Sequence, residues 1–288
     1  MRRGKRAYPK MKRMENMGRF DGILICTDLD GTLYKKDKTI SLENREAIEY
    51  FKRDGGSFTF ITGRMPYYSR EAYSAVKPNV AFGCINGGGL YDGKEMRYVW
   101  TKELPLRVLE LVRHIDEIFP NVGIQLCNLD KTYFAKDNSV TERFRKITGV
   151  PEAPCDYRTF DLSLGKIIFC SDIEDELLSV AHALKSHELA PEFDFIRSER
   201  TLFEILPKGV NKGLALEKLA DHLQIDMNRT VAVGDYDNDA AMLKKAGLGV
   251  AVANASKLAI ESADVVTVSN EEHAIARIIY EIENGKYF

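Results

Sequence analysis

The sequence lacks any long apolar run, and its few cysteines form no close pair. No stretch of the 288-residue chain approaches the roughly 18 to 20 consecutive apolar residues that a membrane-spanning helix needs. No apolar signal segment lies near the start, and no CxxC pair occurs. We therefore expect a reduced cytoplasmic protein with no membrane partner. The five cysteines, several of them within apolar runs, are Cys26, Cys84, Cys127, Cys155 and Cys170.

The chain also lacks an overall excess of positive charge and a composition typical of disorder. Hydrophobic residues make up 44% of the chain, which excludes general disorder, and the length indicates about two domains. Residues 1–19 hold 8 Lys or Arg against 1 Asp or Glu, whereas the rest holds 33 against 42. The acidic body makes nucleic-acid binding unexpected. Residues 1–19 are expected to be a basic N-terminal arm that is disordered or precedes the native start.

From Phe20 onward, short β-rich runs alternate with helical stretches, which is the pattern of a parallel α/β sheet. Ser41 is a candidate helix cap, and Gly55 and Gly56 follow the end of that helix. The same rhythm returns after Lys212. Expected strands are 22–27, 57–62, 80–85, 230–233, 248–252 and 265–268, and expected helices are 41–53, 212–223, 238–246, 256–262 and one at the C-terminus.

The middle third has a different rhythm, with the element order αββαβαββ. This order predicts an open sheet covered by helices on one face, inserted into the first unit. The expected helices are 105–119, 139–147 and 174–187, and the expected strands are 122–127, 132–134, 164–170, 193–197 and 201–206. We therefore predict a core formed by residues 20–100 and 207–288, and a cap formed by residues 101–206.

The motif Asp28-Leu29-Asp30-Gly31-Thr32 follows the first expected strand. Ligands of open α/β sheets bind beyond the carboxyl ends of such strands. An ordinary Asp/Gly turn is the simpler alternative. A calcium loop is excluded, because the twelfth position counted from Asp28 is Thr39 and not Glu.

A second acidic cluster, Gly234-Asp235-Tyr236-Asp237-Asn238-Asp239, follows the strand TVAV. As a helix begins, Asp235, Asn238 and Asp239 share one face. Solvated carboxylates are again the alternative. Two such clusters at two strand ends of one sheet nevertheless favour hard oxygen ligands around Mg²⁺.

Two further elements suit an anion. Thr62-Gly63-Arg64 ends the second strand with a hydroxyl group and flexible N–H groups. Lys212 stands where a helix begins, so that its cation and the helix N-terminus would face the same ligand. Each element alone is more commonly structural than functional.

Taken together, the motifs DLDGT, ITGR, VNKGLAL and GDYDNDAAML resemble those of the haloacid dehalogenase (HAD) superfamily. The segments INGG at 85–88 and VANA at 252–255 resemble those of its Cof-type phosphatases with a type IIB cap. The resemblance runs from Phe20 to the last helix. It implies an α/β fold, with a HAD-like Rossmannoid parallel-sheet core and an inserted α+β cap.

The resemblance also implies a role for each motif residue. Asp28 would be the nucleophile, Asp30 the general acid and base, and Asp239 a residue that positions Lys212 or a metal-bound water. Mg²⁺ would be held by Asp28, the Asp30 carbonyl and Asp235. Phosphoryl oxygens would be held by Leu29, Thr62, Gly63, Lys212 and Asn238, with Arg64, Asn86 and Asn254 as candidate substrate contacts.

These roles imply a magnesium-dependent phosphomonoesterase that acts on a small, sugar phosphate-like metabolite. Two alternatives stay open: a phosphotransferase or sugar-phosphate mutase, and a non-catalytic binding protein on the same fold. The cap loops at 128–134 and 151–160 are candidates for specificity. The sequence names neither the substrate nor the oligomeric state.

Overall fold

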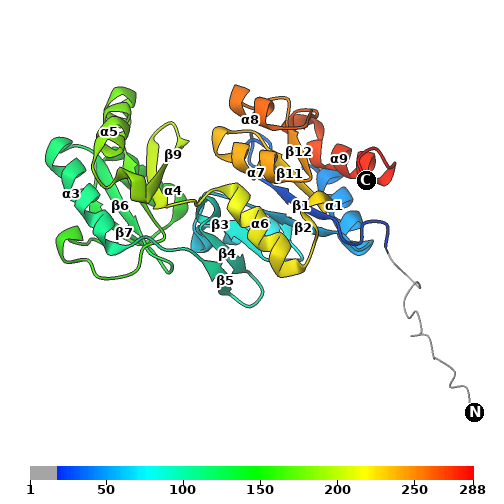
Figure 1. The fold of residues 1–288 in the computed structure, drawn as a ribbon, viewed down its shortest axis with the longest axis horizontal. Coiled ribbons are helices and arrows are strands. Elements are labelled where there is room, and N and C mark those ends of the chain that lie inside the picture. Colours follow the sequence, from blue (N-terminus) through cyan, green and yellow to red (C-terminus); the bar gives the residue numbers. More distant parts are fainter. Residues whose placement is uncertain (1–17) are drawn as a thin grey trace, which may run out of the picture.

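The computed structural model describes residues 18–288, so that most of the predicted N-terminal arm lies outside the described residues. The core is a five-stranded sheet in the order β13-β12-β11-β1-β2, and every strand pair in it is parallel. Figure 1 shows this core on the right and the cap on the left. The core strands are β1 (Leu24–Thr27), β2 (Ser57–Phe60), β11 (Thr230–Gly234), β12 (Leu248–Ala251) and β13 (Val265–Val266).

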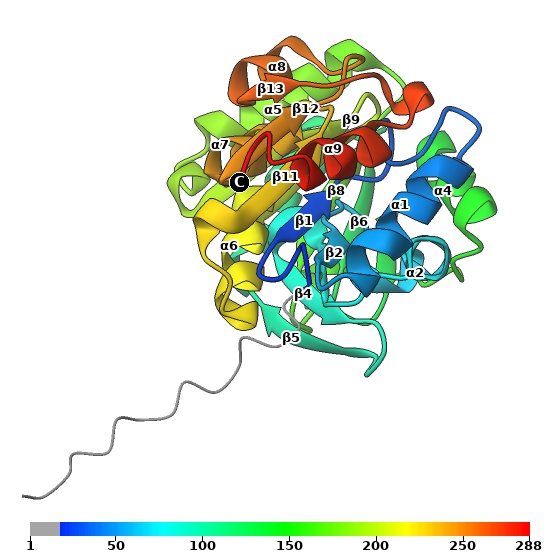
Figure 2. The same cartoon turned by 90° about the vertical axis from the view of Figure 1, so that its right-hand side faces the viewer.

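Helices cover both faces of the core sheet, which explains its nearly continuous apolar strands. In β1, Ile25 packs into the same cluster as the buried residues of α1 (Leu42–Arg53) and α9 (Ala274–Glu283). Its neighbours Leu24 and Cys26 instead join the cluster of α6 (Lys212–Leu223), α7 (Ala240–Lys245) and α8 (Lys257–Ser262). Figure 2 shows α1 and α9 side by side on their face.

Local signals set several of the helix ends. The Ser41 hydroxyl accepts a hydrogen bond from the Asn44 N–H at 3.2 Å, which is the expected cap of α1. After α1, Gly55 adopts a φ of 96°, a backbone conformation that glycine enters without strain. Pro66 opens a 3₁₀ turn, and α2 (Arg70–Val76) follows it.

A small antiparallel sheet extends the core. It contains β3 (Phe82–Cys84), β4 (Gly89–Asp92) and β5 (Arg97–Thr101), and a parallel bridge from Ile61 to Gly83 joins it to β2. Strand β3 is shorter than the expected 80–85, because Ile85 and Asn86 have φ values of 56° and 52° and begin the 3₁₀ turn η2 (Ile85–Gly87).

The cap has the predicted order αββαβαββ and a single antiparallel sheet, β7-β6-β8-β10-β9. Helices α3 and α5 cover one face through a shared cluster, whereas Val140 of α4 packs with residues of the other face. The predicted α/β fold with a parallel core and an α+β cap is confirmed. The cap elements are α3 (Leu109–Ile118), β6 (Gly123–Cys127), β7 (Thr132–Lys136), α4 (Ser139–Thr148), β8 (Lys166–Cys170), α5 (Glu174–Ser186), β9 (Phe193–Glu199) and β10 (Leu202–Pro207).

The domain limits stay a prediction. Strand β5 runs to Thr101 and β10 to Pro207, each one residue past the limits expected from the sequence. All five cysteines are free, and four of them are buried. None of the helices within residues 18–288 is long and apolar enough to span a bilayer.

Two glycines with positive φ allow a matched test of the packing beside η2. An alanine Cβ at Gly87 (φ 102°) would lie 2.0 Å from the Asn211 carbonyl oxygen, whereas one at Gly22 (φ 73°) would meet nothing within 4 Å. Gly22→Ala should lower the free energy of unfolding by about 1–2 kcal/mol, the cost of a left-handed backbone. Gly87→Ala should lose about 1–3 kcal/mol more from the clash. Urea denaturation of both variants measures the difference, and equal losses would contradict the close packing at Gly87.

Candidate active site

Asp28 follows β1 directly and lies at the carboxyl edge of the core sheet. Its main-chain N–H donates to the Val233 carbonyl oxygen at 2.8 Å, so that the β1–β11 pairing continues into the motif. The Asp28 side chain is only 12% exposed. The parallel sheet thus places the Asp28 carboxylate beside the start of the second acidic cluster, which follows the neighbouring strand β11.

Lys212 ties the two acidic segments together. As expected, it is the first residue of α6, and its side chain is 1% exposed. Its ammonium donates to Asp28 Oδ1 at 2.6 Å and to Asp239 Oδ1 at 2.5 Å. Burial works against its charge, but the two carboxylates outweigh burial and raise the pKa of Lys212 above its usual value. The residue is therefore a fixed cation at the base of the site.

The 235–239 loop is closed on itself by Asp239. Its Oδ2 accepts hydrogen bonds from the main-chain N–H groups of Asp235 at 2.8 Å and Tyr236 at 3.0 Å. The loop is a 3₁₀ turn at 237–239, and the α-helix begins only at Ala240, two residues later than the sequence predicts. Asp239 thus accepts hydrogen bonds from the main chain of the loop and from Lys212 at the same time.

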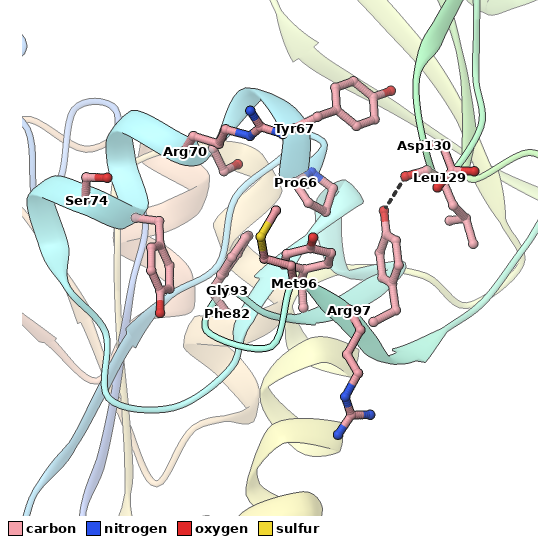
Figure 3. A pocket seen from close by; sticks show the side chains of 14 residues that line it. Pro66, Tyr67, Arg70, Ser74, Phe82, Gly93, Met96, Arg97, Leu129 and Asp130 are labelled. Carbon is pink, nitrogen blue, oxygen red and sulfur yellow. Dashed lines mark hydrogen bonds between the residues drawn. The ribbon is translucent and has the colours of Figure 1, made fainter.

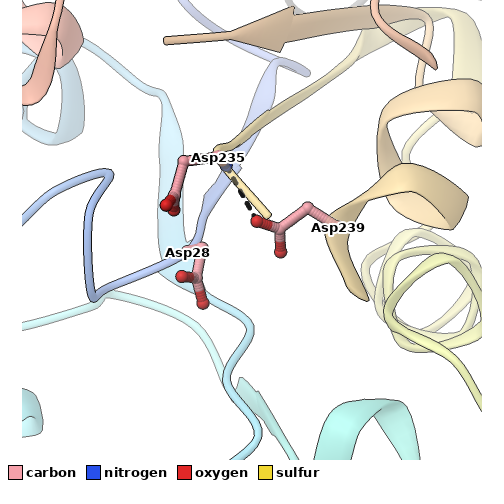
Figure 4. Close-up of side chains that lie close together, drawn as sticks. All are labelled: Asp28, Asp235 and Asp239. Atoms are coloured by element: carbon pink, nitrogen blue, oxygen red, sulfur yellow. Dashed lines mark hydrogen bonds between the residues drawn. The ribbon is translucent and has the colours of Figure 1, made fainter. Parts of the chain in front are cut away.

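Asp28, Asp235 and Asp239 form a cluster that suits a divalent cation (Figure 4). Each offers one oxygen, and these oxygens all lie within 4.8 Å of one another. Burial and neighbouring carboxylates raise the pKa of Asp28, and burial chiefly raises that of Asp235 to about 6. A Cβ on Gly31 would lie 2.3 Å from Asp235 Oδ2, so that only glycine fits beside this carboxylate. Clustered hard oxygens whose charges repel one another are the donor set that Mg²⁺ prefers.

Asp30 faces two cations and is not part of this carboxylate cluster. Its carboxylate accepts hydrogen bonds from Arg64 and from Lys38, each at 2.7 Å. Burial works to raise the pKa of Asp30, but these two cations outweigh burial and hold that pKa below its usual range. The Asp30 side chain is 40% exposed, so that a ligand can reach it.

The predicted phosphoryl-binding segment lies beyond β2. Thr62 is 3% exposed, its N–H donates to the Gly83 carbonyl oxygen at 3.0 Å, and its hydroxyl oxygen accepts a hydrogen bond from the Arg64 N–H at 3.3 Å. Gly63 is partly exposed. Leu29 buries its side chain completely between Asp28 and Asp30, which fixes the main chain there.

Three asparagines expected near the ligand connect loops to one another. Asn86 is fully buried, and its side-chain oxygen accepts a hydrogen bond from the Asn238 amide at 3.2 Å. The exposed Asn254 donates to the Gly31 carbonyl oxygen at 2.8 Å and so supports the first motif.

Some contacts were not predicted. The Thr32 hydroxyl donates to Asp235 Oδ1 at 2.6 Å, and the DLDGT motif contained this signal, because Thr32 follows the glycine of the turn. Lys38 lies in the charged segment KKDKT and has the sequence pattern of a solvated lysine. No local pattern distinguishes it.

A cavity of about 650 Å³ lies apart from these motifs (Figure 3). It lies among α2, the β4–β5 hairpin and the cap loop at 129–130, and the Tyr98 hydroxyl donates to the Leu129 carbonyl oxygen at 3.0 Å there. Leu129 and Asp130 belong to the candidate specificity loop 128–134, and the other lining residues were not among the predicted site residues. The other candidate specificity loop, 151–160, packs its buried Tyr157 with α3, on the helix-covered side of the cap.

Comparison with known proteins agrees with this geometry. A sequence model described as haloacid dehalogenase-like hydrolase matches residues 25–279. The chain belongs to this family. It is 32% identical over 256 residues to the 5-amino-6-(5-phospho-D-ribitylamino)uracil phosphatase YcsE of Bacillus subtilis (strain 168), which covers 89% of this chain and 94% of the relative. Within the HAD family the chain is a Cof-type phosphatase, as its motifs indicated.

Solved structures share the whole architecture. A haloacid dehalogenase-like hydrolase from Bacteroides thetaiotaomicron superposes with a TM-score of 0.78 at 25% identity, over 90% of this chain and 99% of that one. A HAD subclass IIB sugar phosphatase superposes with a TM-score of 0.77 at 18% identity, over 90% of this chain and 98% of that one. At 18% identity, the likeness to the sugar phosphatase is evidence of a shared fold alone.

The carboxylate cluster predicts a magnesium-dependent melting temperature. Mg²⁺ should stabilise the wild-type protein, by about 2.7 kcal/mol at a hundredfold excess over its dissociation constant. Asp235→Asn removes one repelled charge but keeps an acceptor for Thr32. Its metal-free melting temperature should equal or exceed that of the wild type, and it should lose the magnesium response.

Asp237→Asn is the matched control. Asp237 is exposed, bonds to Ser256 at 2.7 Å and lies outside the cluster, so that this variant should keep the full response. Differential scanning fluorimetry with Mg²⁺ and with EDTA measures all three proteins. A magnesium response that Asp235→Asn leaves intact would place the cation elsewhere.

Proposed function

We propose that this HAD enzyme is a magnesium-dependent hydrolase of small phosphomonoesters, with Asp28 as the covalent nucleophile. The observation that carries the proposal is the position of Asp28, between the buried Lys212 ammonium and Asp235 at the edge of the core sheet. A carboxylate that attacks a phosphate dianion is repelled unless fixed positive charge lies beside it. The family assignment supplies the reaction class.

In the first step the Asp28 carboxylate attacks phosphorus and the bond to the leaving oxygen breaks. Lys212, Asn238, Thr62 and the main chain of Leu29 and Gly63 hold the phosphoryl oxygens. Asp30 gives its proton to the leaving oxygen. In the second step Asp30 takes a proton from the water that attacks the aspartyl phosphate, and this releases inorganic phosphate and restores Asp28.

The metal would be held by the carboxylates of Asp28 and Asp235 and by the Asp30 carbonyl oxygen. When bound, Mg²⁺ neutralises the charge of the phosphoryl group and of the clustered carboxylates. Asp239 acts through Lys212, because its carboxylate keeps the ammonium against Asp28.

Without substrate the pKa of Asp30 is low, and the two cations beside this residue explain how it can still act as an acid. Without substrate, Arg64 and Lys38 keep Asp30 ionised. The phosphoryl dianion competes for the same two cations when it binds, and it adds a like charge close to Asp30. Both effects raise the pKa of Asp30 toward the protonated form that the first step needs.

The substrate class is a small, sugar phosphate-like metabolite. The relatives named above act on a phosphorylated ribitylaminouracil and on a sugar phosphate, so that a phosphorylated polyol or sugar is common to both. Asn254 and Arg64, which also meets the phosphoryl group, are the proposed contacts to the rest of the substrate. Five free cysteines agree with a cytoplasmic setting, where thiols stay reduced.

Replacing the nucleophile tests the proposal directly. Asp28→Asn keeps the size of the side chain but removes the attacking carboxylate, so that kcat on p-nitrophenyl phosphate should fall at least about 10⁴-fold. The measurement is release of inorganic phosphate with Mg²⁺. Unchanged activity in this variant would refute the role of Asp28, and transfer of phosphate to a sugar as the dominant outcome would favour the phosphotransferase alternative.

The role of Asp30 is tested through the leaving group. Asp30→Asn should lower kcat on an alkyl phosphate about 10²–10⁴-fold, because an alkoxide must be protonated as it leaves. With p-nitrophenyl phosphate the first turnover should survive, because p-nitrophenolate leaves without a proton, and slow hydrolysis should produce a burst of product. Stopped-flow absorbance measures the burst.

Asp37→Asn is the control, because this exposed carboxylate bonds to Thr39 and lies outside the carboxylate cluster. It should leave both reactions unchanged. Equal loss of the first turnover on both esters in Asp30→Asn would contradict the acid role.

A further inference from the structure

The cap carries an ion pair that is almost completely buried. Lys166 of β8 is 4% exposed and Glu204 of β10 is 2% exposed. The Lys166 ammonium lies 3.0 Å from both carboxylate oxygens of Glu204. Their neighbours Ile167 and Ile205 pack with α3 and α5, so that the two charged side chains point to the opposite face of the sheet.

Both partners of this ion pair also bond to the core. Lys166 Nζ donates to the Gly63 carbonyl oxygen at 3.0 Å, and Asn86 Nδ2 donates to Glu204 Oε2 at 2.9 Å. Ser198 of the cap completes the set by donating to Glu204 Oε1 at 2.5 Å. The ion pair is therefore a junction between the cap and the core.

Asn86 connects this junction to the proposed phosphoryl-binding groups. Its main-chain N–H donates to the Thr62 carbonyl oxygen at 3.1 Å, and its side-chain oxygen accepts a hydrogen bond from Asn238 at 3.2 Å. A Cβ on Gly63 would lie 2.9 Å from that same Asn86 oxygen. Thr62, Gly63 and Asn238 thus all lie against one residue, Asn86, whose side chain is fully buried.

We propose that Asn86, Glu204 and Lys166 are positioning residues that make the phosphoryl-binding loop depend on the seated cap. This inference rests on the proposed function, because it assigns value to Thr62, Gly63 and Asn238 as holders of phosphoryl oxygens. It also gives Asn86 a different task from the substrate contact expected from the sequence. Both polar groups of its side chain are already bonded, and the residue is closed to solvent.

Because the junction is a buried ion pair, the phosphoryl-binding loop depends strongly on the seated cap. A buried ammonium or carboxylate that loses its partner is far less stable than the intact pair. If the cap moves away, the Gly63 carbonyl oxygen loses its hydrogen bond from the Lys166 ammonium. Asn86 then also loses Glu204, the acceptor that orients its side-chain amide. The bond to Asn238 is then no longer held from the other side.

An exchange of donor and acceptor tests this arrangement. Asn86→Asp tolerates the left-handed backbone at this position (φ 52°) but sets a carboxylate against Glu204. Glu204→Gln leaves Lys166 without its counter-charge. In the double variant the glutamine amide donates to the new carboxylate, and the net charge of the junction is restored.

We expect each single variant to lower kcat/KM on p-nitrophenyl phosphate about tenfold or more, the effect of roughly one lost charge-assisted hydrogen bond. Each should weaken inhibition by orthovanadate by a similar factor, because vanadate occupies the phosphoryl position. The double variant should recover both properties to within about threefold of the wild type. Circular dichroism melting gives the folded fraction of each protein.

Lys136→Met is the matched control, because Lys136 pairs with Asp116 inside the cap and bonds to nothing in the core. It should lower the melting temperature and leave vanadate inhibition unchanged. If the single variants fold poorly, Ser198→Ala removes one bond to Glu204 and should give a smaller change of the same kind.

The outcomes separate this inference from the proposed function. Hydrolysis by the wild type that is lost in Asp28→Asn establishes the phosphatase, whatever the junction does. Single variants whose kcat falls only with the folded fraction, at unchanged vanadate inhibition, would overturn the positioning role. A double variant no better than the worse single variant would also overturn it.

Discussion

The site depends on one buried ammonium held between two carboxylates. Lys212 begins α6, Asp28 directly follows β1, and Asp239 stands where α7 begins. A cation at this depth is stable only with both partners in place, so that its burial fixes how these three elements meet. The packing of Gly87 against the Asn211 carbonyl holds the η2 turn to the same point. This edge of the core sheet is thus built around charge compensation and close backbone contact.

Much of this edge could be predicted, because parallel strands end at a common edge. Asp28 and Asp235 follow strands that are neighbours in the sheet, so that two acidic segments about two hundred residues apart in the sequence had to converge if the sheet formed. The element order of the cap could be predicted as well, because the spacing of its apolar residues changes from the helical to the strand period at clear turns. The detail at Ile85 and Asn86 was not, because a β-branched residue with positive φ has no local signal.

The junction between the cap and the core was beyond sequence reasoning for a different reason. Lys166 in KIIFC and Glu204 in LFEILP each stand alone within an apolar strand. On an open antiparallel sheet, such alternating charges normally face water. Only the docking of a second layer turns that face into an interior. Lys38 is the converse case, an exposed lysine whose importance comes entirely from the carboxylate that it meets.

Strand β1 has one pairing partner before the cap in the sequence and the other after it. Strand β1 pairs with β2 nearby, but its other edge waits for β11, where Leu24 lies beside Thr230. The cap strands, by contrast, all fall between residues 123 and 207 and pair among themselves. All the cap strands therefore leave the ribosome before β11, so that their pairing partners are present while β1 still lacks its second neighbour. An unpaired strand edge is a site of wrong association, and this apolar edge stays unpaired until β11, in the last third of the chain, has emerged.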